Sequence, residues 1–111
     1  MAVQVTTEHV GARTVVHVGG EIDVASADRL REQVAHLLAE GRTDLVVDLT
    51  DVSFMDSTGL GLLVGTLKRV RLAGGRLGLV VTSERILKVL RITGLTEVFT
   101  IHDTLDAALA G

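Results

Sequence analysis

The stretch Phe54-Met55-Asp56-Ser57-Thr58-Gly59-Leu60-Gly61 marks a change from a strand pattern to a helix pattern. Residues 45–49 before it are apolar on both faces except for Asp48, which is typical of a central parallel strand. Beyond it, apolar side chains recur at the spacing of one helical face, at Leu60, Leu63, Val64 and Leu67. We therefore expect a strand-to-helix junction, with a carboxylate and a hydroxyl at the start of the helix.

Upstream of this junction the chain predicts a hairpin followed by a helix. Residues 3–5 and 14–18 are β-branched runs on either side of a turn near Gly11. Leu30, Val34, Leu37 and Leu38 then fall on one face of a helix of about four turns. Ser26 is the expected N-cap of this helix, and Gly41 is its expected end.

Downstream of the junction the pattern alternates again. Gly61 and Gly65 lie one turn apart on the second helix, which permits close approach of another backbone, and Gly74-Gly75 should end this helix. The remaining predicted elements are a strand at residues 77–81, a helix capped by Ser83 that ends before Gly94, a strand at residues 98–101, and a terminal helix capped by Asp103 with Leu105 and Leu109 facing inward. This order predicts one α/β domain over residues 1–111, with a mixed sheet of four to five strands and about four helices packed against it.

Composition excludes several classes of function. The 111 residues fit one domain, and their formal net charge of −3, with basic residues scattered along the chain, gives no footprint for direct nucleic-acid binding. The chain has no Cys, which excludes disulfides and thiolate chemistry and suits a reducing compartment. No apolar run approaches the roughly 18 residues that would span a bilayer, so we expect no membrane insertion and a cytoplasmic location.

Ser57 has two compatible interpretations. Ser is a preferred N-cap residue, although Asp56 could cap the helix in its place. The hydroxyl at the mouth of a helix is also a place for a phosphate, because N–H groups of a first helical turn lack partners and carry positive partial charge. We therefore expect Ser57 to be both accessible and able to carry an anion.

Catalytic and metal-binding alternatives have little support. The histidines are far apart in sequence and match no metal-ligand spacing: His9, His17, His36 and His102. No Gly-x-Ser-x-Gly turn surrounds Ser57, as a serine hydrolase would need. Asp48 lacks the acidic pair and late Lys that accompany a phosphorylated aspartate in receiver domains. We predict no catalytic residue, no metal and no cofactor.

The junction, together with Gly20-Glu21-Ile22-Asp23, Gly74-Gly75 and Thr93-Gly94-Leu95, resembles the anti-sigma factor antagonist family of bacteria, the prototype STAS domains. The resemblance covers essentially the whole chain, in order. It implies a partner-switching protein that is not an enzyme. The unphosphorylated form would bind an anti-sigma factor that is also an ATP-dependent serine kinase, and binding would free the sigma factor.

Position by position, the resemblance implies phosphorylation of Ser57, the first hydroxyl residue after the Asp, and its reversal by a metal-dependent serine phosphatase of the PP2C type. It also implies partner contacts from Asp23, Asp56, Ser57, Thr58 and Gly59, although Asp23 and Asp56 are equally expected as turn or capping residues. The alternative function is that of a STAS subunit in a membrane transporter or a nucleotide-sensing assembly. The intact Ser57 argues against it.

Overall fold

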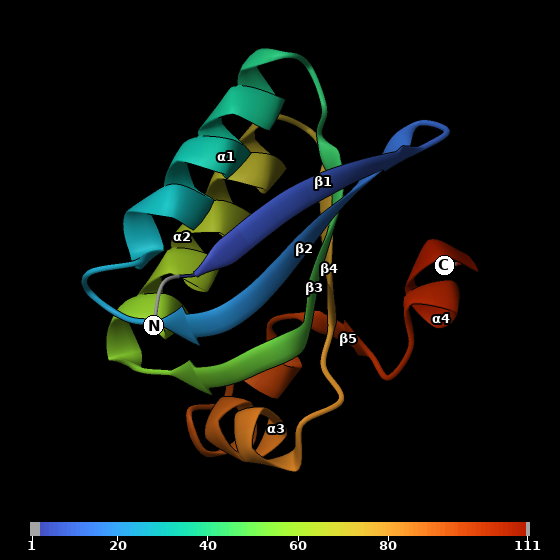
Figure 1. Ribbon diagram of the computed structural model, residues 1–111. Coiled ribbons are helices and arrows are strands. Elements are labelled where there is room, and N and C mark those ends of the chain that lie inside the picture. Colours follow the sequence, from blue (N-terminus) through green and yellow to red (C-terminus); the bar gives the residue numbers. More distant parts are fainter. Residues whose placement is uncertain (1–2, 111) are drawn as a thin grey trace.

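Strand β3 (Asp44–Met55) is the central strand of a five-stranded mixed sheet with the order β1-β2-β3-β4-β5. The computed structural model describes residues 3–110 (Figure 1). Strands β1 (Gln4–Val10) and β2 (Arg13–Ile22) form an antiparallel hairpin. β2, β3, β4 (Arg76–Val80) and β5 (Thr100–His102) are mutually parallel, so their carboxyl ends lie at one edge of the sheet.

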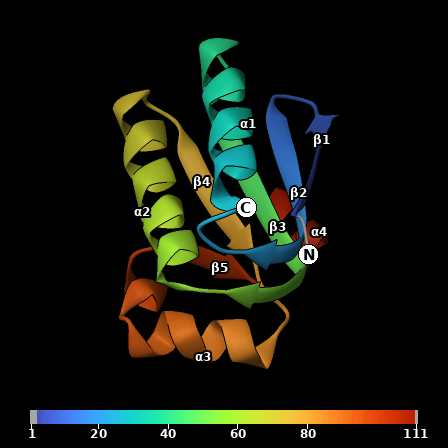
Figure 2. The same cartoon turned by 60° about the vertical axis from the view of Figure 1, so that its left-hand side comes forward.

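Helices cover the two faces of the sheet unequally. α1 (Ala27–Ala39) and α2 (Ser57–Leu72) lie side by side on one face, and α4 (Leu105–Ala110) packs on the other (Figures 1 and 2). α3 (Glu84–Ile92) and the short 3-10 helix η1 (Leu95–Glu97) complete the chain. The main core lies under α1 and α2, and a small second cluster consists of Val15, Val46, Val80 and Ala108.

The order of strands and helices agrees with the prediction, and most differences concern the ends of elements. β3 continues to Met55, beyond the expected strand at residues 45–49, so that Phe54 belongs to the sheet. The last strand starts at Thr100 rather than at residue 98. The prediction that Asp103 caps the terminal helix is wrong. Thr104 directly precedes the first helical residue, and its Oγ1 accepts a hydrogen bond from the N–H of Ala107 at 3.0 Å.

No other described element makes the close approach that Gly61 and Gly65 permit. Among residues 3–110, no atom of another element lies within 4 Å of a Cβ built at either glycine. α1 and α2 lie side by side (Figure 2), and both bury leucines in the main core, Leu30 from α1 and Leu63 from α2. The two glycines therefore face open space.

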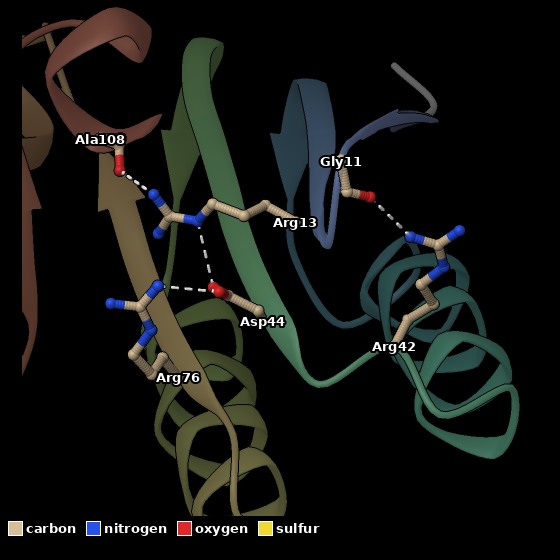
Figure 3. A network of polar contacts seen from close by, with 6 residues as sticks. All are labelled: Gly11, Arg13, Arg42, Asp44, Arg76 and Ala108. Atoms are coloured by element: carbon tan, nitrogen blue, oxygen red, sulfur yellow. Dashed lines mark hydrogen bonds and ion pairs between the residues drawn. The ribbon is translucent and has the colours of Figure 1, made fainter. Parts of the chain in front are cut away.

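An arginine–aspartate network holds the amino ends of the parallel strands together (Figure 3). Asp44 accepts from Arg13 Nε at 3.2 Å and from Arg76 Nη2 at 2.8 Å, which links β2, β3 and β4. Arg13 Nη1 also donates to the carbonyl of Ala108 at 2.7 Å and so ties α4 to the sheet. This network lies at the end of the sheet opposite the strand-to-helix junction.

His17 joins three strands on the part of the sheet that α4 leaves open. Its Nδ1 lies 2.9 Å from Asp48 Oδ2 on β3, and its Nε2 lies 3.0 Å from Glu8 Oε1 on β1. The hydrogen bond to Glu8 and the contact with Asp48 raise the pKa of His17 against the opposing effect of burial. Burial works to raise the pKa of Asp48, but hydrogen bonds from Thr50 and His17 outweigh it and lower that pKa.

The His17 bridge predicts a pH dependence of stability. Because the pKa of His17 is raised in the folded state, its contribution is complete below the ordinary value of 6.5 and is lost as pH rises through the folded pKa. A pair of this exposure is worth about 1 kcal/mol or less. We expect the free energy of unfolding of the wild type, relative to His17→Gln, to fall between about pH 5.5 and pH 8.5 in urea titrations. His36→Gln, which removes only an exposed contact with Glu40, should keep the wild-type dependence; an unchanged profile in His17→Gln would contradict the assignment.

Candidate functional site

Strands β2 and β3 place two carboxylates next to each other at the carboxyl edge of the sheet. Ile22 pairs with Met55 at the end of the parallel ladder, and the N–H of Asp56 donates to the carbonyl of Ile22 at 3.2 Å. Asp23 and Asp56 therefore leave neighbouring strands at the same level, where adjacent strands are about 4.8 Å apart. The turn that carries Asp23 thus lies beside the start of α2.

Asp56, and not Ser57, is the N-cap of α2. Its backbone is extended, with φ −96° and ψ −170°, and its Oδ1 accepts from the N–H groups of Thr58 at 2.9 Å and Gly59 at 3.2 Å. Its carbonyl accepts the first intrahelical bond, from Leu60 at 3.1 Å. The capping interpretation of Ser57 is therefore wrong, because a carboxylate one residue earlier already reaches the free amides of the first turn.

Ser57 is left exposed as the first residue of the helix. Among residues 3–110 its hydroxyl has no hydrogen-bond partner, so the fold does not use it. The expectation that free N–H groups would accommodate an anion here needs correction, since Asp56 occupies two of them. A negative group on Ser57 would meet a carboxylate instead.

Asp23 is held in a braced turn before α1. Its Oδ1 accepts from the N–H of Ser26 at 3.0 Å, and the Ser26 hydroxyl donates to the carbonyl of Glu21 at 2.6 Å. Ser26 occupies the predicted N-cap position, but its hydroxyl bonds to this turn and makes no capping bond to the helix. Hydrogen bonds from Ser26 lower the pKa of Asp23, so its carboxylate is charged at neutral pH.

Gly59 is buried beneath the junction and has a packing role. A Cβ at this position would lie 2.5 Å from Met55 Cγ and 2.9 Å from Ile22 Cγ2. The absence of a side chain therefore lets α2 sit directly on the ends of β2 and β3. Thr58 is half-buried and gives its N–H to Asp56. A direct contact of either residue with a partner stays a prediction.

Two exposed apolar side chains near the junction were not identified from the sequence as site residues. Val24, on the Asp23 turn, is 73% exposed, and Phe54, two residues before Asp56, is 45% exposed. Large apolar side chains on a surface beside charged groups are typical of protein contacts. The sequence contained a sign of this exposure. Val24 stands in the turn after Asp23, and Phe54 directly precedes the core residue Met55, so the two side chains of this strand point to opposite faces.

Two further findings concern metal ions and membranes. Within residues 3–110, no group of three or more His, Asp or Glu side chains is placed to hold a metal ion. No helix in the same range is long and apolar enough to cross a membrane. What the junction offers chemically is the exposed alcohol of Ser57, directly after the capping carboxylate of Asp56 and at the edge of the sheet that also carries the Asp23 turn.

Comparison with known proteins finds the STAS domain family, whose sequence pattern matches residues 3–108. The anti-sigma-B factor antagonist of Bacillus subtilis (strain 168) is 50% identical over 86 residues, which cover 78% of this chain and 78% of that protein. An anti-sigma factor antagonist from Mycobacterium paratuberculosis has a similar structure, with a TM-score of 0.89, 31% identity, and coverage of 97% of this chain and 92% of that one. The Bacillus cell fate determinant SpoIIAA in its phosphorylated form gives a TM-score of 0.75 at 26% identity, covering 96% of this chain and 97% of that one.

The cap at Asp56 predicts different costs for two substitutions. Asp56→Ala should lower the free energy of unfolding by about 1 kcal/mol, because the N–H groups of Thr58 and Gly59 lose their acceptor. Asp56→Asn keeps an acceptor oxygen at the same place and should cost clearly less. Urea unfolding of both variants measures this difference, and an equal cost would show that charge, not capping, is the contribution of Asp56.

The glycines of α2 predict opposite effects of one added methyl group. Gly59→Ala should destabilise the protein by about 1–3 kcal/mol, because its Cβ would overlap buried side chains. Gly61→Ala is the matched control on the same helix: its Cβ meets open space, and it should stabilise by about 0.5–1 kcal/mol through helix propensity. Thermal and urea unfolding would test both, and a stabilising Gly59→Ala would refute the packing role.

Proposed function

Because this chain belongs to the STAS domain family, we propose that it is an anti-sigma factor antagonist, which binds an anti-sigma factor in its unphosphorylated form and so releases the bound sigma factor. It acts by binding and not by catalysis. The observation that carries the proposal is the exposed, unbonded Ser57 hydroxyl beside Asp56, in a chain 50% identical to an anti-sigma-B factor antagonist. The setting of this exchange is the cytoplasm, where sigma factors act.

Phosphorylation of Ser57 is the proposed switch. The anti-sigma factor acts as the serine kinase, and a PP2C-like serine phosphatase restores the binding form. The accessibility of Ser57 supports this role, since neither the sheet nor the helix needs its hydroxyl. The existence of a phosphorylated form of SpoIIAA, a protein with the same fold, is consistent with it.

The electrostatics of the junction account for loss of binding. A phosphate adds about −1.5 to −2 charge at neutral pH, next to Asp56 and the charged Asp23. At an effective dielectric constant near 20, like charges about 4 Å apart repel by roughly 4 kcal/mol before salt screening. This repulsion also acts in the free protein, so affinity falls only by the part that grows when the interface excludes water, together with the desolvation and bulk of the phosphate. These effects weaken binding without any refolding of the domain.

The site residues divide into two roles in this proposal. Asp23, Ser57 and Thr58 lie at least partly exposed, and they present charge and hydroxyls to the anti-sigma factor. Asp56 caps α2, and Gly59 seats it on the sheet, so these two residues fix the position of Ser57. In this proposal Asp56 and Gly59 meet the partner at the backbone of the first turn of α2.

The proposal predicts the behaviour of Ser57 variants with the anti-sigma factor kinase of the same organism. Incubation with this kinase and ATP should add one phosphate, at Ser57, as read by mass spectrometry of peptides. In calorimetric titrations Ser57→Ala should bind with or without ATP, and Ser57→Asp should bind at least ten-fold more weakly, about 1.4 kcal/mol.

Ser53→Ala serves as the control, because it removes an exposed hydroxyl of β3 outside the proposed contact surface and should leave phosphorylation at Ser57 intact. Full affinity of Ser57→Asp would contradict the repulsion mechanism. Capture of a transporter subunit from the same cells, with no anti-sigma factor, would favour the alternative function.

A further inference from the structure

A groove runs along α2 from the proposed phosphorylation site toward the other end of the helix. Its volume is about 280 Å³, and it is lined by Arg31 of α1 and by six residues of α2: Thr58, Gly61, Leu62, Gly65, Thr66 and Arg69. From residue 58 to residue 69, a helix rises by about 16 Å. The groove therefore begins beside Ser57 and is long enough to receive several residues of an extended or helical segment.

The charge of this groove is opposite to that of the junction. Among residues 3–110, Arg31 and Arg69 are the charged residues that line it. Arg31 forms an ion pair with Asp28 on its own helix, whereas Arg69 is exposed and has no ion pair among residues 3–110. The surface around α2 thus carries acidic groups at the start of the helix and, near its end, the guanidinium of Arg69, which is unpaired among the described residues.

The floor of the groove is helix backbone at Gly61 and Gly65, and packing within the described residues does not require glycine at either position. Gly61 and Gly65 each cost about 1 kcal/mol of helix stability relative to Ala. A Cβ at either position would meet no atom of another element within 4 Å among the described residues, so packing in this chain does not demand glycine. Without side chains here, a second backbone can approach α2 closely.

We propose that this cationic groove binds an acidic segment of the anti-sigma factor, adjacent to Ser57. The inference rests on the proposed function and adds the chemistry of the partner surface. Carboxylates match the bidentate geometry of Arg side chains. Thr58 belongs both to the groove and to the proposed contact surface, so one partner can cover both.

The charges around α2 also set the orientation and selectivity of binding. The favoured partner places basic groups against Asp23 and Asp56 and carboxylates along the groove. Its electrostatic attraction to α2 is favourable in this orientation only, because the reverse orientation brings like charges together. An anti-sigma factor without the acidic segment would leave Arg69 facing apolar or basic groups and would be rejected. The groove therefore selects among anti-sigma factors, while Ser57 controls the time of binding.

The test measures affinity for the purified anti-sigma factor kinase of the same organism, without ATP. Arg69→Glu should weaken binding at least ten-fold, with a smaller dependence of affinity on salt than in the wild type. Gly65→Ala should also weaken binding at least ten-fold, because its methyl group fills the floor of the groove. Gly65→Ala is expected to raise the stability of the free protein, so its loss of affinity cannot come from unfolding.

Arg71→Glu is the matched control, because it makes the same charge change in the last turn of the same helix, outside the groove lining. It should bind within two-fold of the wild type. Affinity within two-fold of the wild type for either Arg69→Glu or Gly65→Ala would overturn the groove proposal. If the wild type itself fails to bind, or if Ser57→Asp binds as the wild type does, the failure lies with the proposed function instead.

Discussion

The parallel pairing of β2 with β3, carried to the last residue of each strand, is the constraint on which the site depends. Because Ile22 pairs with Met55 and then accepts the N–H of Asp56, the Asp23 turn and the start of α2 are held side by side. The same two apolar side chains form the seat into which Gly59 fits. Charge, hydroxyl and helix axis are therefore positioned by the core and not by a flexible loop.

This arrangement separates folding from switching. The cap of α2 comes from Asp56, so the neighbouring hydroxyl is not needed for stability. A modification at Ser57 can then change the charge of the surface without removing a structural hydrogen bond. If Ser57 itself capped the helix, phosphorylation would alter the end of α2 together with the surface that it presents.

Hydrophobic periodicity was sufficient to predict the order of elements, the central strand and the position of the junction. It could not decide which of two adjacent residues caps a helix. The observed caps, Asp56 and Thr104, each lie one position away from the expected ones, Ser57 and Asp103. The sequence also did not reveal that His17 bridges Glu8 and Asp48, since that contact depends on the register of three strands. The sequence shows that Gly61 and Gly65 permit a close approach to α2, but it does not show whether a neighbour among the described residues makes one.

The ion pairs of Asp44 with Arg13 and Arg76 lie far from Ser57. Arg13 and Ile22 lie at opposite ends of β2, about 30 Å apart at the usual rise of a strand. The Debye length at physiological salt is only about 8 Å, so a phosphate on Ser57 does not disturb the pairing of Asp44 with Arg13 and Arg76. The groups that respond to such a charge are those within one or two turns of the start of α2. A reversible modification can then change what the surface binds while the sheet, the core and the arginine network stay as they are.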